Sequence, residues 1–192
     1  KAMEWKRKYD PVRKEYFDHK DNVHPYAFMR ILSQKMSKDA ILVGDCGGNI
    51  VISNHAFETK YRQRNITNNG NSPMGFSFAG AMGAWFAAPD RQVICTIGDG
   101  GFNMNIQELQ TVVHHQLNLK LFVLNNDGYL SMRMSQGGFF GRLVGAGPQS
   151  GVSFPDILKV AAAYGLPALR AEGAAFEETI RAALATEGPV VC

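Results

Sequence analysis

The sequence has 192 residues, of which 45% are hydrophobic and 19% are charged, a balance typical of a globular domain rather than of a disordered or fibrous chain. Twenty lysines and arginines against 17 acidic residues leave a formal net charge of +3, too small and too scattered to favour a nucleic-acid partner. Apolar runs stay short of the roughly 20 residues that a membrane-spanning helix needs, and the three cysteines show no CxxC spacing. We therefore expect no membrane span, no disulfide framework and a cytoplasmic location.

Residues 1–22 differ from the rest of the chain. Seven basic and five acidic residues alternate there with the aromatic residues Trp5, Tyr9, Tyr16 and Phe17. Such mixed charge predicts a solvated helical linker whose aromatic side chains dock on a neighbour. At the other end, the chain stops inside an expected strand, at Val190-Val191-Cys192. We expect residues 1–22 to be a charged linker from upstream domains that are not in this chain, and residues 23–192 to be one domain truncated at its C-terminus.

From residue 23 onward, helical and strand patterns alternate. The apolar periodicity predicts helices over residues 25–36, 50–57, 75–88, 105–115, 154–164 and 176–185. Short, mostly apolar runs predict strands over residues 40–43, 92–97, 119–124 and 189–191, and the polar stretch 64–68 is a further strand candidate. Continuous apolar strands that alternate with helices are typical of a parallel sheet covered on both faces. We expect a three-layer α/β domain with a doubly wound, mostly parallel sheet of about six strands.

Three of the expected strands end in polar, glycine-rich turns, at residues 44–49, 98–101 and 125–128. Ligands of such sheets bind beyond the carboxyl ends of the strands. Glycine lets backbone N–H groups approach a phosphate closely, and the start of a following helix favours an anion. Each turn alone is weak evidence, because many α/β loops need glycine merely to turn.

The second and third turns also carry hard oxygen ligands. Asp99 offers a carboxylate, Asn126 a side-chain carbonyl and Gly128 a backbone carbonyl. Mg²⁺ prefers a few protein oxygens together with water and phosphate oxygens. One helix and one strand separate Asp99 from Asn126, and a right-handed crossover would bring them to neighbouring strand ends. The spacing therefore predicts a phosphate loop and a metal site at the same place.

Gly98-Asp99-Gly100, followed after 24 residues by Asn125-Asn126, resembles the thiamine diphosphate-binding motif. Nearly the whole chain is similar to the C-terminal, diphosphate-binding domain of the acetolactate synthase-like enzymes. Three further features fit that branch: the run from Gly100 to Met104, the Met74-Gly75 pair before an Ala/Gly-rich helix, and the sequence Gly188-Pro189-Val190 near the C-terminus. The resemblance implies the thiamine diphosphate-binding fold, with thiamine diphosphate and Mg²⁺ as cofactors.

The resemblance also implies roles for particular residues. Asp99, Asn126 and the Gly128 carbonyl would hold Mg²⁺, which bridges the diphosphate. The Ser72 backbone carbonyl would receive the 4′-amino group of the cofactor, and Met74 would wedge the cofactor into its bent shape. The complete set of expected cofactor-binding residues is Gly47, Gly48, Asn49, Ser72, Met74, Gly98, Asp99, Gly100, Gly101, Asn126, Gly128, Tyr129 and Leu130.

The implied activity is the decarboxylation of a 2-oxo acid, with pyruvate as the expected donor, followed by carboligation. The glutamate that activates the cofactor comes, in the family, from the pyrimidine-binding domain of a partner subunit. We therefore expect no catalytic residue in this chain, no activity from it alone, and a homo-oligomer, dimer or tetramer, in the complete enzyme. FAD, where this branch carries it, is held mainly by a middle domain.

Some positions depart from the acetolactate synthase pattern. Ser131 stands where that pattern has Met, Ser135 stands where it has Trp, and Gly48-Asn49 replace Gln-His. These positions would line the acceptor side of the pocket. One alternative is an enzyme that uses an aldehyde or a sugar ketone as acceptor, or one that only decarboxylates its substrate. A second alternative is a non-enzymatic phosphate- or nucleotide-binding module of flavodoxin type. Arg133 is either a clamp for a substrate carboxylate or a solvated or interface arginine.

Overall fold

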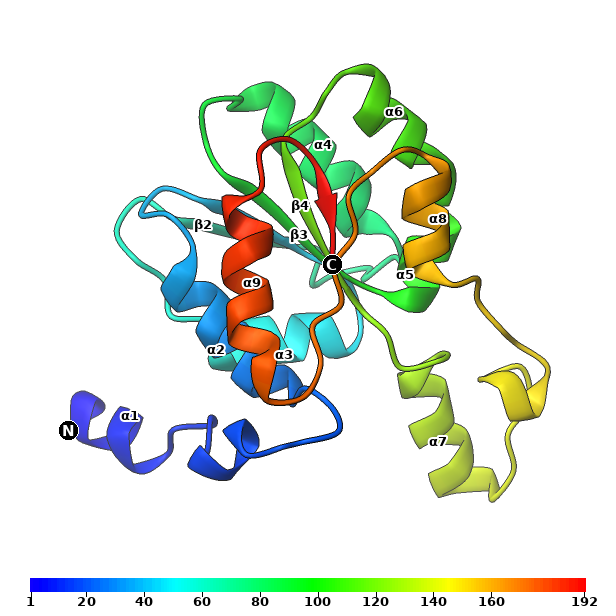
Figure 1. The fold of residues 1–192 in the computed structure, drawn as a ribbon. Helices are drawn as coiled ribbons and strands as arrows, with labels where there is room; N and C mark the ends of the chain where they lie inside the picture. The colour runs from blue at the N-terminus through cyan, green and yellow to red at the C-terminus, as the bar shows by residue number, and fades with distance from the viewer.

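The computed structural model describes residues 1–192, the side chain of Lys6 excepted. Its centre is a five-stranded sheet in the order β2-β1-β3-β4-β5, in which every pair of neighbours is parallel (Figure 1). The strands are β1 (Ile41–Gly44), β2 (Arg64–Thr67), β3 (Val93–Gly98), β4 (Leu119–Leu124) and β5 (Val190–Val191). The expected parallel α/β fold is confirmed. The strand count is five rather than about six, and beyond β5 the sheet continues only as an isolated bridge between Ala168 and Val191.

Helices cover both faces of the sheet. One face packs against α2 (Pro25–Lys35), α3 (Gly48–Ala56) and α9 (Phe176–Ala185). The other face packs against α4 (Phe76–Ala87), α5 (Asp99–Met104), α6 (Leu109–His114) and α8 (Ile157–Ala163). Each face has its own apolar core, and the central strands contribute to both because successive side chains point to opposite faces.

Helix α4 approaches the sheet closely because it is rich in small residues. A Cβ built on Gly80 would lie 3.1 Å from a methyl carbon of Val43 in β1. The glycine therefore lets the helix backbone pack directly on the strand. Its position confirms the expectation of a tightly packed helix over residues 75–88.

Two of the predicted helices differ from the structure. The helix expected over residues 105–115 consists of a short 3-10 turn (Ile106–Glu108) followed by α6. A separate helix, α5, begins directly at Asp99, so most of the turn expected at residues 98–101 is helical. The helix expected from residue 154 begins at Ile157 instead. Asp156 is its N-cap, and the Asp156 carboxylate accepts hydrogen bonds from the backbone N–H groups of Leu158 and Lys159 at 2.9 and 3.2 Å.

The first 24 residues contain the short helix α1 (Ala2–Lys8) and a 3-10 turn (Lys14–Phe17). The ring of Tyr16 stacks on His24 with centroids 3.7 Å apart, and Tyr16 packs on the core beneath α2. Arg30 of α2 forms an ion pair with Asp10 at 2.9 Å. The segment therefore docks on the body through its second half, whereas Trp5 in α1 is exposed.

Helix α7 (Leu130–Phe140) was not expected and stands apart from the body of the molecule (Figure 1). None of its residues is buried, and Phe139 and Phe140 are 84% and 74% exposed. It lies in the long connection between β4 and α8. Among the described helices, none has the length and hydropathy that crossing a membrane would require.

Candidate functional site

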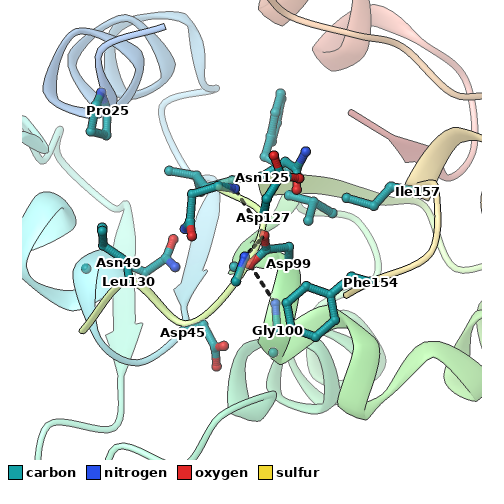
Figure 2. A pocket seen from close by; sticks show the side chains of 18 of the residues that line it. Pro25, Asp45, Asn49, Asp99, Gly100, Asn125, Asp127, Leu130, Phe154 and Ile157 are labelled. Atoms are coloured by element: carbon teal, nitrogen blue, oxygen red, sulfur yellow. Dashed lines mark hydrogen bonds between the residues drawn. The ribbon is translucent and has the colours of Figure 1, made fainter. Parts of the chain in front are cut away.

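The strand order places three glycine-rich turns at one edge of the sheet. From β1 the chain proceeds to β2 on one side, and from β3 it proceeds to β4 on the other, so the connections diverge between these two central strands. A crevice at such a point is where open α/β sheets bind ligands. A cavity of about 1070 Å³ opens there (Figure 2). All the residues expected to bind the cofactor line it, from Gly47 at the end of β1 to Leu130 at the start of α7.

Asp99 lies at the centre of this cavity and is only 2% exposed. One carboxylate oxygen accepts a hydrogen bond from the Gly100 N–H at 2.8 Å. The other accepts from the N–H groups of Asn126 and Gly128, both at 3.0 Å. The end of β3 is thus joined to the turn after β4, as the right-handed crossover predicts. These three bonds fix the direction of the carboxylate.

The side chain of Asn126 is held by Arg133 of α7. The Arg133 guanidinium donates to the Asn126 side-chain oxygen and to its backbone carbonyl, each at 2.8 Å, and to the Asp127 carbonyl at 3.0 Å. Gly128 leaves room for this group, because a Cβ there would lie 3.0 Å from a guanidinium nitrogen. Arg133 therefore braces the 126–128 turn, a role that neither of the two interpretations of its sequence position included.

The oxygen atoms at this turn fit a magnesium ion that is completed from outside the chain. The Asp99 carboxylate keeps one lone pair after its three hydrogen bonds, and the Asn126 side-chain oxygen keeps one beside its bond from Arg133. The Gly128 carbonyl has no hydrogen-bond partner among the described residues. No group of three or more His, Cys, Asp or Glu side chains able to hold a metal occurs in the described part of the chain. A metal ion here would be bound by the Asp99 carboxylate, the Asn126 side-chain oxygen and the Gly128 carbonyl, with water or phosphate oxygens as the remaining ligands. Mg²⁺ prefers such a set of oxygen ligands.

The turn after β1 leads into the N-terminus of α3, which opens on the cavity. Gly47 is the N-cap of this helix and has a φ of 62°, a conformation that favours glycine. The neighbouring Asn49 is 7% exposed, and its side-chain oxygen has no hydrogen-bond partner among the described residues. Free backbone N–H groups at a helix start and an unpaired buried polar side chain suit a polar ligand in the cavity.

Ser72 and Met74 belong to a turn between β2 and α4, here named the 72–75 turn. Ser72 has a φ of 45°, which is rare for a residue with a side chain, and its N–H and hydroxyl both donate to the Asn68 carbonyl at 3.1 Å. The methyl end of Met74 faces Gly100, where a Cβ would lie 3.1 Å away. The 72–75 turn thus meets Gly98 and the first turn of α5, together named the 98–101 turn.

Asp45 is a cavity residue to which the sequence analysis assigned no role. It follows β1, is 2% exposed, and accepts hydrogen bonds from the N–H groups of Gly75 at 3.1 Å and Ser77 at 3.3 Å. Burial raises the pKa of its carboxyl above the usual value, against the opposing effect of these N–H groups. An acidic residue directly after a buried strand, with two glycines after the next residue, was the available signal, but nothing in the sequence indicated its partners.

Residues 154–158 line the cavity on the side away from α3, and no motif had pointed to them. The ring of Phe154 contacts Tyr129 edge to face, with centroids 5.4 Å apart. Figure 2 shows Phe154 and Ile157 on the opposite side of Asp99 from Asn49 and Leu130. Apart from Asp156 this wall is apolar, and it therefore suits the organic part of a ligand.

Comparison with known proteins agrees with this geometry. Residues 45–192 match the family model of the thiamine pyrophosphate enzyme, C-terminal TPP-binding domain. The chain is 34% identical over 173 residues to a catabolic acetolactate synthase of Raoultella terrigena, covering 88% of this chain and 30% of that protein. It is 35% identical over 140 residues to a probable acetolactate synthase large subunit of Methanococcus aeolicus, covering 71% and 22%.

A third relative is the acetolactate synthase isozyme 2 large subunit of Escherichia coli K12, which is 32% identical over 168 residues, covering 85% of this chain and 30% of the relative. The chain thus spans less than a third of the length of each of these relatives. The match to the family model covers most of the chain and includes the glycines of the three turns that line the cavity. The chain belongs to the thiamine pyrophosphate enzymes, as a C-terminal TPP-binding domain of the acetolactate synthase type.

Proposed function

We propose that this chain holds thiamine diphosphate through Mg²⁺ in an enzyme that decarboxylates a 2-oxo acid, with pyruvate as donor, and ligates the product to an acceptor. The observation that carries the proposal is the arrangement of Asp99. Its buried carboxylate is aimed by N–H groups of Gly100, Asn126 and Gly128, at the point where two glycine-rich turns meet. A simple anion-binding module has no need of a buried carboxylate at the centre of its site.

Different residues of the chain would then bind the metal, the diphosphate and the two rings of the cofactor. Asp99, Asn126 and the Gly128 carbonyl bind the metal, and the 98–101 turn and the start of α3 bind the diphosphate. Ser72 and Met74 orient the two rings of the cofactor. When bound, thiamine diphosphate supplies a thiazolium ring that takes up the electron pair left by decarboxylation. This chain excludes water from one side of that ring, through Met74 and the apolar wall at Phe154.

The remaining parts of the reaction would come from outside the chain. We propose that residues 1–22 are the linker from preceding domains, and that the pyrimidine-binding domain of a partner subunit supplies the activating acid. The limited coverage of the acetolactate synthase relatives supports this division. We also predict that the complete protein is a homo-oligomer; whether it binds FAD depends on a middle domain outside this chain. The acceptor would enter on the α7 side, near Ser131.

Calorimetry with thiamine diphosphate and with a mononucleotide, each with and without Mg²⁺, tests the binding proposal in the full-length protein. We expect thiamine diphosphate to bind only with Mg²⁺ and the mononucleotide to bind in neither condition. Metal-independent binding of both ligands would contradict the proposal. Product analysis with pyruvate alone, and with pyruvate plus an aldehyde, then separates acetolactate formation from ligation to another acceptor.

A further inference from the structure

Gly75 is held from two sides by side chains that belong to different elements. Its N–H donates to the Asp45 carboxylate at 3.1 Å, and its carbonyl accepts a hydrogen bond from the Asn105 side-chain amide at 2.7 Å. Asp45 follows β1, and Asn105 follows α5. Gly75 itself has a φ of 86°, so the backbone at this point is in a conformation that favours glycine. Two long-range polar contacts therefore fix the peptide groups on both sides of one glycine.

Asp45 caps helix α4 from outside the helix. The N-cap position of α4 is Gly75, which has no side chain to accept a hydrogen bond, and Asp45 reaches the N–H groups of both Gly75 and Ser77. Two carboxylate oxygens can accept both bonds, whereas an asparagine amide has a single acceptor oxygen and would present an NH₂ group to the second N–H. The position thus requires a carboxylate, although a buried negative charge is unfavourable.

Asp45 also contacts both of the turns that meet in the cavity. A Cβ built on Gly101 would lie 2.2 Å from an Asp45 carboxylate oxygen and 3.2 Å from the Gly75 nitrogen. The 98–101 turn therefore packs directly against Asp45 and against the peptide that follows Met74. Among the described residues Asp45 forms no ion pair, so backbone N–H groups, those of Gly75 and Ser77 foremost, are its polar support.

We propose that Asp45 and Asn105 are positioning residues that hold the Gly75 peptide and so keep the 72–75 turn in register with the 98–101 turn. This inference rests on the proposed function, because these turns are the ones assigned to the two ends of thiamine diphosphate. Neither side chain is assigned a contact with the cofactor. Each acts through Gly75, which places Met74 and Ser72 relative to the diphosphate loop.

A double-mutant cycle in the full-length protein tests the inference, with calorimetric affinity for thiamine diphosphate in excess Mg²⁺ as the readout. We expect Asp45→Asn and Asn105→Ala each to weaken binding by about 10-fold, the effect of one lost hydrogen bond to a buried group. Because both side chains act on the same peptide, the double variant should bind only slightly more weakly than either single variant.

Gln63→Ala is the matched control. Gln63 is 8% exposed and also joins two backbone segments, since its amide donates to the Ser37 carbonyl at 2.7 Å and accepts from the Lys60 N–H at 2.8 Å. It lies just before β2, at the opposite edge of the sheet from the cavity. We expect Gln63→Ala to lower the melting temperature while leaving the affinity for thiamine diphosphate at the wild-type value.

The outcomes separate this inference from the proposed function. If the wild-type protein does not bind thiamine diphosphate with Mg²⁺, the proposed function is wrong. If the wild type binds but Asp45→Asn and Asn105→Ala bind equally tightly, or lose affinity independently of one another, the inference alone is wrong. Should Asp45→Asn fail to fold, Asn105→Ala decides the question: unchanged affinity in that variant, measured beside Gln63→Ala, rejects the positioning role.

Discussion

The two edges of the sheet use buried or half-buried charged groups of opposite sign. At the carboxyl edge, the carboxylates of Asp45 and Asp99 accept hydrogen bonds from backbone N–H groups. At the amino edge, cationic side chains donate to backbone carbonyls. Lys120, which is 2% exposed, donates to the carbonyls of Thr186 and Gly188, and Arg91 donates to those of Asp39 and Arg62.

The difference follows from the direction of the helices. In a parallel α/β fold the helices run opposite to the strands, so helix N-termini with unpaired N–H groups gather at the carboxyl edge and helix C-termini gather at the other. The N–H groups favour anions, and the carbonyls favour cations. The amino edge satisfies its carbonyls internally, whereas the carboxyl edge retains a cavity, which is where an anionic cofactor fits.

The largest effect on the carboxyl edge is expected from Asp99→Ala. This variant removes the charged ligand of the proposed metal site, so Mg²⁺-dependent binding of thiamine diphosphate should weaken by about 100-fold or more. Calorimetry on the full-length protein measures it, with Asp90→Ala as the control because Asp90 is an exposed turn residue. Wild-type affinity in Asp99→Ala would mean that the metal site lies elsewhere.

At the amino edge, Lys120→Met should destabilise the fold and leave the cofactor site intact. The variant removes the donor to the Thr186 and Gly188 carbonyls, and an unsatisfied buried polar group costs about 1–3 kcal/mol. Urea denaturation should therefore show a free energy of unfolding lower by about 2 kcal/mol. A loss of thiamine diphosphate affinity in the folded variant would show that the two edges are not independent.

A methyl group added at the carboxyl edge should affect both the stability of the fold and the affinity for thiamine diphosphate. Gly101→Ala would place a Cβ 2.2 Å from the Asp45 carboxylate, so the 98–101 turn must shift, at a cost of about 1–2 kcal/mol and several-fold in cofactor affinity. Gly83→Ala on α4 is the matched control, since no atom lies within 4 Å of its added Cβ. Thermal unfolding and calorimetry should find Gly83→Ala at least as stable as the wild type, with normal binding.

The smallest effect is expected at the N-terminus of α2, which is capped by a group that can become cationic. The neutral His24 ring accepts a hydrogen bond from the Tyr26 N–H at 3.2 Å, and burial, followed by the nearby His19, lowers the pKa of His24. A lowered pKa means that this stabilisation is present above the ordinary value near 6.5 and is lost as the pH falls through the lowered pKa.

Melting temperatures measured from pH 7 downward test this cap. The wild type should lose about 1 kcal/mol more than His24→Asn, because asparagine is a good N-cap that does not titrate. Parallel curves for the two proteins would show that the His24 cap contributes nothing to stability. A gain in wild-type stability on acidification would contradict the assigned direction of the pKa shift.

The sequence defined most of the sheet well because four of its five strands are short apolar runs bounded by polar turns, the exception being the polar edge strand β2. The strand expected over residues 119–124 coincides with β4, and the others agree within one residue at each end. The right-handed crossover also brought Asp99 beside Asn126. Contacts between side chains and distant backbone were not predictable: neither the Asp45 contact with Gly75 nor the brace from Arg133 to Asn126 leaves a periodic signal. Helix α7 was missed because it has no buried face to create an apolar pattern.

The isolation of α7 has a consequence for how substrate choice can change over evolutionary time. The helix contributes no buried residue, and it lies in a connection whose closure entropy changes by only about 0.6 kcal/mol when its length doubles. Substitutions in α7 that spare Arg133 therefore leave the core untouched, whereas Arg133 itself joins α7 to Asn126 and so to the diphosphate end of the site. Under the proposed function, the part of the cavity nearest Ser131 would diversify while other residues maintain the stability of the domain, so acceptor specificity and folding would be under separate selection.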